Sequence, residues 1–512
     1  MKPLLYVLCF FFGFESAQAA IQQKISLNNQ EIFQKSTREG NQEFIRLDIP
    51  SENMDKNLGA PELPVRSWLV MGTPNSVRVQ YQVQKTETFT GRVYPVQEQE
   101  CRCASDKKRT FQFRSDLYPR KEMAQVEFLG SYRGQPVSRV DVFLGRADEA
   151  RGSFEIVTQA NINISADPFI FQNEDFNDYL IVVPSALAEG ITKFVDEKRM
   201  QGYNVYVEVV GSPSLTTAGL QTLIQTAYKQ KGIDFVILVG DETSLPMFKV
   251  STSGSSQTPS DLKYFTMDGA DDYIPDVLGS RISASSAEQV AVQLQKSIDY
   301  EKTFKMSSSG MKKFIGIASN EGSNPSDDQY VRSIAERFKQ VVQAEPIHLF
   351  QDDSVQSNPL FLNSEINEGA FWLTYLGHGS GTSWPSMNQW YTTQNIKQLS
   401  NQTSVKPIII DVACQNGKLR SGQLGTTFME AQGSAFGATA YYGGSVDISW
   451  HPPAVMARGI AFEQLEKRFK HLGQALLAGQ LYLAANWNNT SQVIDNFEWY
   501  HLQGDPGMKL DY

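Results

Sequence analysis

Residues 408–417 read Ile-Ile-Ile-Asp-Val-Ala-Cys-Gln-Asn-Gly, and upstream residues 371–381 read Phe-Trp-Leu-Thr-Tyr-Leu-Gly-His-Gly-Ser-Gly. Each stretch contains a continuous apolar run, which is typical of a strand buried on both faces of a parallel sheet. Each run is followed by one reactive side chain, Cys414 or His378. Ligands of open parallel sheets bind beyond the carboxyl ends of the strands, so we expect both side chains to face one crevice.

Continuous apolar runs of the same kind recur through the C-terminal two thirds of the chain. Further apolar runs lie at 179–183, 205–210, 235–239 and 314–318. They alternate with amphipathic stretches, which predicts right-handed βαβ units and a doubly wound, mainly parallel sheet. The Ser-rich stretch 307–310 divides this region into two expected subdomains, 176–310 and 311–512.

From residue 20 to residue 175 the pattern is different. Apolar and polar residues alternate in short stretches such as Ser76–Gln84 and Gln125–Leu129. Alternation of this kind, interrupted by Gly, Pro and Asn, predicts a half-buried antiparallel β domain. The expected fold class is therefore α/β, with two doubly wound subdomains preceded by an antiparallel β domain.

The N-terminus has the pattern of an export signal. Lys2 precedes the apolar stretch Leu4–Phe14, and Ala17-Gln18-Ala19 has the form of a signal-peptidase site. We expect residues 1–19 to be removed and the remainder to be secreted, outside the cell or into the periplasm. No later segment approaches the roughly 20 apolar residues of a transmembrane helix. A net charge of −10 and a pI near 5.2 argue against a nucleic-acid partner.

Cysteine and histidine are scarce, with four Cys and five His in the chain. Signal removal leaves Cys101, Cys103 and Cys414, and a free thiol in an exported protein indicates chemistry. His378 can take the Cys414 proton and give a nucleophilic thiolate. The Gly379 and Cys414 amides are candidates for an oxyanion hole. The alternative is a pair of buried strand ends that happen to carry His and Cys. No His has a metal-binding spacing, so no metal site is predicted.

The two motifs, at 376–384 and 411–417, closely resemble those of the gingipain family of bacterial cysteine peptidases, which have the caspase-like fold. Further family landmarks follow in the same order at Gly240-Asp241, 276–281, 297–301, 318–321 and 504–506. Residues 59–68, Gly-Ala-Pro-Glu-Leu-Pro-Val-Arg-Ser-Trp, are similar to the gingipain prodomain. The resemblance thus implies a caspase-like catalytic region with a prodomain over residues 20–175.

This resemblance implies a secreted cysteine endopeptidase that is made as a zymogen and inhibited by its own prodomain. His378 is then the general base and acid, and Cys414 is the nucleophile that forms a thioester with a protein or peptide substrate. Glu321 matches a family glutamate that lies close to the catalytic histidine and orients it.

The resemblance also implies cleavage after Arg or Lys. The family's arginine-specific members carry an aspartate in the specificity pocket, and Asp327 and Asp328 lie in the matching loop. Trp450 matches a tryptophan that lines this pocket, and Asp447 is a second acidic candidate. A tandem Asp pair is also a normal helix cap, and the shorter loop does not decide between the two aspartates.

Two other functions fit the same residues. The first is a catalytically silent or permanently inhibited caspase-like scaffold, and the second is a sortase-like transpeptidase whose thioester is resolved by an amine. No cofactor is required for Cys–His chemistry. Several relatives bind calcium, so the resemblance allows a structural calcium ion near Asp271-Asp272 or Asp327-Asp328, although no EF-hand-like loop exists.

Overall fold

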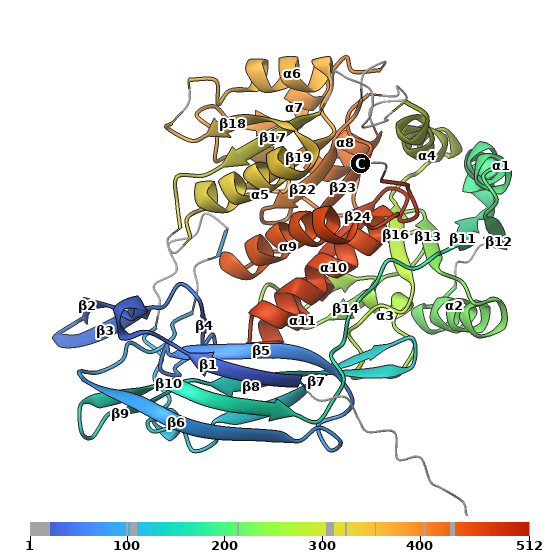
Figure 1. The fold of residues 1–512 in the computed structure, drawn as a ribbon. Helices are drawn as coiled ribbons and strands as arrows, with labels where there is room; N and C mark the ends of the chain where they lie inside the picture. The colour runs from blue at the N-terminus through green and yellow to red at the C-terminus, as the bar shows by residue number, and fades with distance from the viewer. Residues whose placement is uncertain are drawn as a thin grey trace, which may run out of the picture.

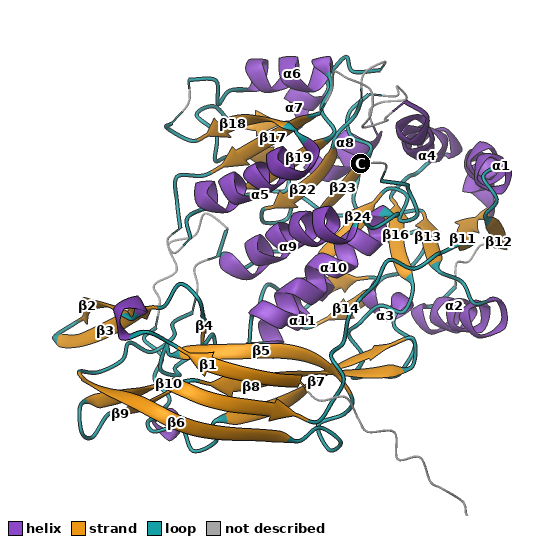
Figure 2. Cartoon of the chain, in the orientation of Figure 1, coloured by secondary structure: helices purple, strands orange, loops and turns teal. Residues whose placement is uncertain are grey.

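The computed structural model of the chain places a β-rich N-terminal domain beside a larger α/β region (Figure 1). The described residues are 21–98, 101–102, 110–211, 215–303, 312–322, 325–353, 355–402, 405–430 and 436–510. The expected signal peptide, 1–19, lies outside them. No helix among the described residues is long and apolar enough to cross a membrane. Figure 2 shows that strands dominate the N-terminal domain and that helices flank the sheets of the α/β region.

Two antiparallel sheets and a hairpin make up the N-terminal domain. The first sheet contains β1 (Ile21–Ser26), β10 (Ser153–Ile164), β6 (Val79–Thr90) and β9 (Gly145–Asp148). The second has the order β4 (Asn53–Met54), β5 (Pro64–Met71), β8 (Gln135–Phe143) and β7 (Ala124–Tyr132), and the hairpin pairs β2 (Phe33–Glu39) with β3 (Gln42–Asp48). Alternate residues of β10, such as Ile162 and Ile164, are buried in a core shared by both sheets. The period-two pattern predicted this arrangement, which is confirmed.

The first α/β sheet is parallel, with the order β12 (Asn204–Val210), β11 (Asp178–Pro184), β13 (Phe235–Val239) and β16 (Leu278–Ile282). Every residue of β13 is buried, as expected for a strand covered on both faces. The elements that accompany this sheet are α1 (Thr192–Met200), α2 (Thr217–Lys231), α3 (Leu262–Phe265), α4 (Ala287–Thr303), β14 (Phe248–Val250) and β15 (Thr258–Ser260).

The second α/β sheet carries both motifs from which the fold was predicted. Its order is β18 (Glu345–Phe350), β17 (Lys313–Ala318), β19 (Trp372–Leu376), β22 (Ile408–Val412), β23 (Ala440–Gly444) and β24 (Tyr500–Gln503). All neighbours are parallel except β24, which is an antiparallel edge strand. The accompanying elements are α5 (Asp327–Val342), α6 (Pro359–Glu368), α7 (Thr393–Ile396), α8 (Leu424–Glu430), α9 (His451–Lys467), α10 (Leu472–Asn486), α11 (Thr490–Trp499), β20 (Ser383–Trp384) and β21 (Tyr391–Thr392). The predicted α/β class is confirmed, whereas the domain boundaries at 175 and 310 stay predictions.

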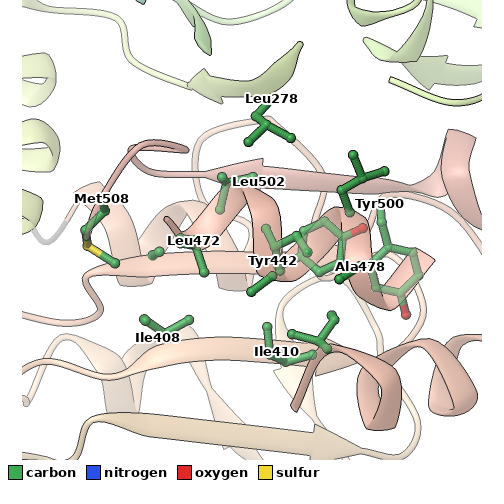
Figure 3. Close-up of a cluster of buried hydrophobic side chains, with 14 of the residues drawn as sticks. Leu278, Ile408, Ile410, Tyr442, Leu472, Ala478, Tyr500, Leu502 and Met508 are labelled. Atoms are coloured by element: carbon green, nitrogen blue, oxygen red, sulfur yellow. The ribbon is translucent and has the colours of Figure 1, made fainter. Parts of the chain in front are cut away.

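One hydrophobic core joins the two α/β sheets. Ile408 and Ile410 of β22, Tyr442 of β23 and Leu502 of β24 point into it, and Leu278 of β16 reaches it from the other sheet (Figure 3). Because these side chains are buried together, the two sheets are held as one body with continuous packing.

The N-terminal domain is fastened to the α/β region at several places. The Ser131 amide donates to Asp272 (2.9 Å), and the Arg133 guanidinium pairs with Asp234 (2.8 Å). On another side, the buried Arg139 guanidinium donates to the Trp487 carbonyl oxygen (3.1 Å) in the loop between α10 and α11. A further contact is made by residues 101–102, which touch both Cys414 and His378.

Candidate active site

His378 and Cys414 follow adjacent parallel strands. Leu376 of β19 lies opposite Val412 of β22, and the Gly377 amide donates to the Val412 carbonyl oxygen (3.2 Å). The backbones stay close beyond the strands, since a Cβ placed on Gly379 would lie 2.7 Å from the Cys414 nitrogen. The structure therefore brings His378, Gly379 and Cys414 together at one edge of the sheet.

The Cys414 thiol is buried and is a free cysteine. Its sulfur accepts a hydrogen bond from the Ile448 amide (3.3 Å) and lies 3.7 Å from the Cys101 sulfur of the N-terminal domain. Burial raises the pKa of the Cys414 thiol to about 12. With the N-terminal domain in place, the thiol is therefore protonated at neutral pH.

A buried carboxyl group supports the loop that carries Cys414. Asp411 accepts hydrogen bonds from the Trp384 indole (2.9 Å), the Asn416 amide group (3.1 Å) and the Tyr441 hydroxyl. Asn416 in turn accepts from the Gly381 amide (2.9 Å), which joins the two motif loops. Burial raises the pKa of Asp411 to about 6. This network fixes the positions of the Cys414 and His378 loops.

Both ring nitrogens of His378 face hydrogen-bond acceptors. Nε2 lies 3.0 Å from Oε1 of Glu321, and Nδ1 lies 2.8 Å from the carbonyl oxygen of Arg102. A carboxylate and a carbonyl only accept, so an N–H at either ring nitrogen of His378 has an acceptor within reach. The Ser386 hydroxyl accepts from the His378 amide (2.9 Å) and holds its backbone. Glu321 therefore lies where the resemblance implied.

Arg102 is a site residue that the sequence did not reveal. Its side chain is fully buried, and two of its nitrogens donate to the two carboxylate oxygens of Asp327 (2.8 and 2.7 Å). Its Nε and Nη2 also donate to the Trp450 carbonyl oxygen (3.0 and 2.8 Å), and its Cζ lies 4.5 Å from the Trp450 ring centroid. An arginine of the N-terminal domain is thus buried between Asp327 and Trp450 of the α/β region, next to the residue that contacts Cys414.

The structure distinguishes the three acidic candidates. Asp327 is fully buried at the start of α5 and accepts from the Ser319 hydroxyl (2.7 Å) as well as from Arg102. Asp328 is partly exposed and pairs with Arg332 one helical turn along (3.3 Å). Asp447 accepts from the Gln415 side chain (2.7 Å) near Cys414. Of these contacts, only those of Asp327 are made to the buried guanidinium.

Two groups among the described residues bring three metal-binding side chains together: Cys101 with Cys414 and Asp447, and Asp268 with Asp272 and Asp276. Cys101 is already in a disulfide, so its sulfur is not a thiolate ligand. Asp272 and Asp276 accept hydrogen bonds from backbone amides, including the Ser131 amide. The carboxylate of Asp327 is occupied by Arg102. A structural calcium ion near Asp271-Asp272 or near Asp327-Asp328 stays a prediction.

Replacement of Gly379 by alanine is expected to reduce kcat/KM at least about a hundredfold. The added Cβ would lie 2.2 Å from the Cys414 carbonyl oxygen and 2.7 Å from the Cys414 nitrogen, so it would displace the loop that carries Cys414 and crowd the two amides predicted to bind an oxyanion. The control is Gly211→Ala, because a Cβ at Gly211 meets no atom within 4 Å. Equal activity of the two variants in a peptide-hydrolysis assay would show that the close approach of Gly379 to the Cys414 backbone is not needed for activity.

The chain is similar in sequence to known proteins. Residues 172–511 match the model of peptidase family C25. Gingipain R2 of Porphyromonas gingivalis is 29% identical over 288 residues, which are 54% of this chain and 37% of that protein. Lys-gingipain HG66 of the same species is 24% identical over 576 residues, 95% of this chain and 32% of that protein. The chain therefore spans about a third of the length of these curated relatives.

Two solved structures are similar to the chain. The Arg-specific cysteine proteinase gingipain R has a TM-score of 0.60 at 25% identity, covering 67% of this chain and 80% of that one. The complex of the pro- and mature domains of Porphyromonas gingivalis RgpB has a TM-score of 0.58 at 26% identity, covering 65% and 79%. The predicted family and fold are thus confirmed.

Proposed function

Since the chain belongs to peptidase family C25, the gingipain family, we propose that it is a secreted cysteine endopeptidase that cuts after arginine and is made as a zymogen. The observation that carries this proposal is the position of Arg102. Its side chain fills the pocket at Asp327, its carbonyl oxygen faces His378, and its neighbour Cys101 lies against Cys414. A substrate arginine bound in the same way would present its carbonyl carbon to the nucleophile.

The shape of the Asp327 site favours arginine over lysine. Two nitrogens of the Arg102 guanidinium donate to the two carboxylate oxygens of Asp327. The Arg102 Cζ also lies 4.5 Å from the centroid of the Trp450 ring. A planar fork of donors fits such a bidentate contact, whereas the ammonium group of lysine offers a single charged centre. We therefore expect cleavage after Arg to be the faster of the two.

Catalysis would follow from the same contacts. His378 takes the Cys414 proton, the sulfur attacks the carbonyl carbon, and the Gly379 and Cys414 amides stabilise the oxyanion. His378, which Glu321 orients through Nε2, protonates the leaving amine from Nδ1, the nitrogen that faces the Arg102 carbonyl. Water then resolves the thioester, with His378 as the base.

The N-terminal domain would keep the enzyme latent in two ways. Arg102 occupies the specificity pocket, so no substrate arginine can enter. Cys101 of the same domain lies 3.7 Å from the Cys414 sulfur, and burial of this thiol raises its pKa and disfavours the reactive thiolate. Removal of the domain would reverse both effects.

A substrate series tests the proposed specificity. The intact chain is treated with a protease that does not cut after basic residues, and the product is assayed on peptides that differ only in Arg, Lys or Ala before the cut bond. We expect kcat/KM for Arg to exceed that for Lys by about tenfold or more, with Ala lower still. Equal values for Arg and Ala would overturn the arginine pocket.

Replacement of Arg102 by alanine is expected to relieve latency. The change leaves buried Asp327 without its cation, and breaking such a pair costs about 3–5 kcal/mol. The intact Arg102→Ala chain should react with an arginyl acyloxymethyl ketone at least about a hundredfold faster than the wild type. Mass spectrometry measures the rate at which Cys414 is labelled. Arg114→Ala is the control, because Arg114 belongs to the same domain but pairs on the surface with Asp116. Identical labelling of all three chains would show that Arg102 does not close the pocket.

A further inference from the structure

Two cysteines from different domains meet at the active site. The Cys101 sulfur of the N-terminal domain lies 3.7 Å from the Cys414 sulfur of the α/β region, 313 residues along the chain. Cys101 takes part in a disulfide, whereas Cys414 is free. The second cysteine of that disulfide is therefore not Cys414. The nucleophile faces a disulfide sulfur at van der Waals distance.

The contact between the two sulfurs is fixed by the contacts of the adjacent residue. Arg102 donates through its amide to the Ile448 carbonyl oxygen (3.1 Å), and its side chain is held by Asp327 (2.8 Å). Cys101 itself forms an antiparallel bridge with Ser449. Ile448 also donates its amide to the Cys414 sulfur (3.3 Å), so the same short segment, Ile448–Trp450, positions both cysteines. The arginine that closes the pocket thus also aligns the sulfurs.

We propose that Cys101 is a redox lock for Cys414, closed by thiol–disulfide exchange. The inference rests on the proposed function, because it needs Cys414 to act as a nucleophile. When base removes the proton of the buried Cys414 thiol, its sulfur forms a bond to the Cys101 sulfur, and the bond between Cys101 and its present partner breaks. The partner leaves as a thiolate and takes up the proton that Cys414 lost. One disulfide replaces another, so no external oxidant is consumed.

The disulfide between Cys101 and Cys414 would keep the enzyme latent through a covalent bond. In the exchanged form the nucleophile is capped, and the N-terminal domain remains attached to the catalytic region even after the chain between them is cut. A small-molecule thiol would open the lock by the reverse chemistry, regenerating free Cys414. An exported protein meets such thiols where the surroundings are reducing, so activation would require both cleavage of the chain and a reductant.

Disulfide mapping tests the exchange directly. The intact chain is incubated at mildly alkaline pH, quenched with acid, alkylated and digested with pepsin without reduction. We expect a peptide pair joined through Cys101 and Cys414, together with one newly alkylated cysteine elsewhere. Cys101→Ser and Cys414→Ser chains should lack the pair. Recovery of wild-type Cys414 only in alkylated form, with the original disulfide of Cys101 intact, would overturn the inference.

An activity measurement on the cleaved protein separates this inference from the proposed function. After cleavage between the domains, the wild type should gain about tenfold or more in arginyl-peptide hydrolysis when a thiol reductant is added, and the Cys101→Ser protein should be equally active without it. An active enzyme with no cross-linked pair and no such difference overturns the redox lock alone. A cross-linked pair in a protein that never hydrolyses peptides, with or without reductant, overturns the peptidase function alone.

Discussion

Replacing Cys414 with alanine is expected to lower kcat/KM for arginyl peptides by about 10⁵-fold or more. Cys414 provides the sulfur that bonds to the substrate, and no other described thiol in the α/β region can take its place. Loss of a catalytic nucleophile removes the covalent route and leaves only the residual effect of binding and the oxyanion site. The measurement is hydrolysis of an arginyl peptide by the chain freed of its N-terminal domain.

Two controls make this result specific to the chemistry. The Cys414→Ala protein should bind the arginyl peptide with an affinity within a few-fold of the wild type, because Asp327 and Trp450 are unchanged. Its melting temperature should move little, since Ile448 loses only a weak hydrogen bond to sulfur (3.3 Å). Full hydrolysis by this variant would show that Cys414 is not the nucleophile. An inactive wild type that still binds the peptide would support the scaffold hypothesis.

The thioester would also decide between hydrolysis and transpeptidation. Both reactions share Cys414 and His378 and differ in whether water or an amine resolves the intermediate. Adding an amine nucleophile to the wild-type assay measures the partition, and the Cys414→Ala protein should give neither product. A sortase-like enzyme would yield the amide as the main product.

The placement of His378 and Cys414 at one edge of the sheet was predictable from sequence, because each residue comes shortly after the end of its own strand. A fully apolar run such as Ile408–Val412 predicts a buried parallel strand, and the residue just beyond it must lie at the edge of the sheet. The same reasoning placed His378 after β19. The sequence does not reveal that β19 and β22 are neighbours in the sheet, but two parallel strands are enough to predict that both residues lie at the same edge.

Arg102 could not be predicted in this way, because its role depends on docking between domains. Arg102 and Asp327 are 225 residues apart, and neither lies in a pattern that specifies the other. In the sequence Arg102 lies between Cys101 and Cys103, and this triplet gives no indication that the arginine reaches Asp327. A buried arginine is rare enough to indicate a partner, but burial becomes visible only in the folded structure.

The choice between Asp327 and Asp328 was open for a related reason. Both occur in the first turn of α5, where either carboxylate suits a helix N-terminus. Consecutive residues of a helix point about 100° apart, so only one can face the pocket. Packing of α5 against the sheet buries Asp327 and leaves Asp328 partly exposed beside Arg332.

Replacing Asp327 with asparagine is accordingly expected to lower kcat/KM for arginyl peptides about a thousandfold. Asparagine has nearly the same shape and can still accept from the Ser319 hydroxyl, but it removes the charge that faces the guanidinium. A buried cation that loses its partner costs about 3–5 kcal/mol, which corresponds to a factor of about 10²–10⁴. Peptides with Ala before the cut bond should be cleaved at almost the wild-type rate. The ratio of kcat/KM for the Arg peptide to kcat/KM for the Ala peptide should therefore fall.

Asp328→Asn is the matched control for this change. The two substitutions are chemically identical and one residue apart, yet Asp328 contacts Arg332 on the surface and not the pocket. Its loss should change the free energy of unfolding by about 0.5 kcal/mol or less and leave the Arg to Ala ratio unaltered. In the intact chain, Asp327→Asn should also weaken the binding of the Arg102 side chain. Labelling of Cys414 should then become faster, as is expected for Arg102→Ala. A drop in the Arg to Ala ratio with Asp328→Asn instead would reassign the pocket to the neighbouring residue, and the docked position of Arg102 would then not represent a bound substrate.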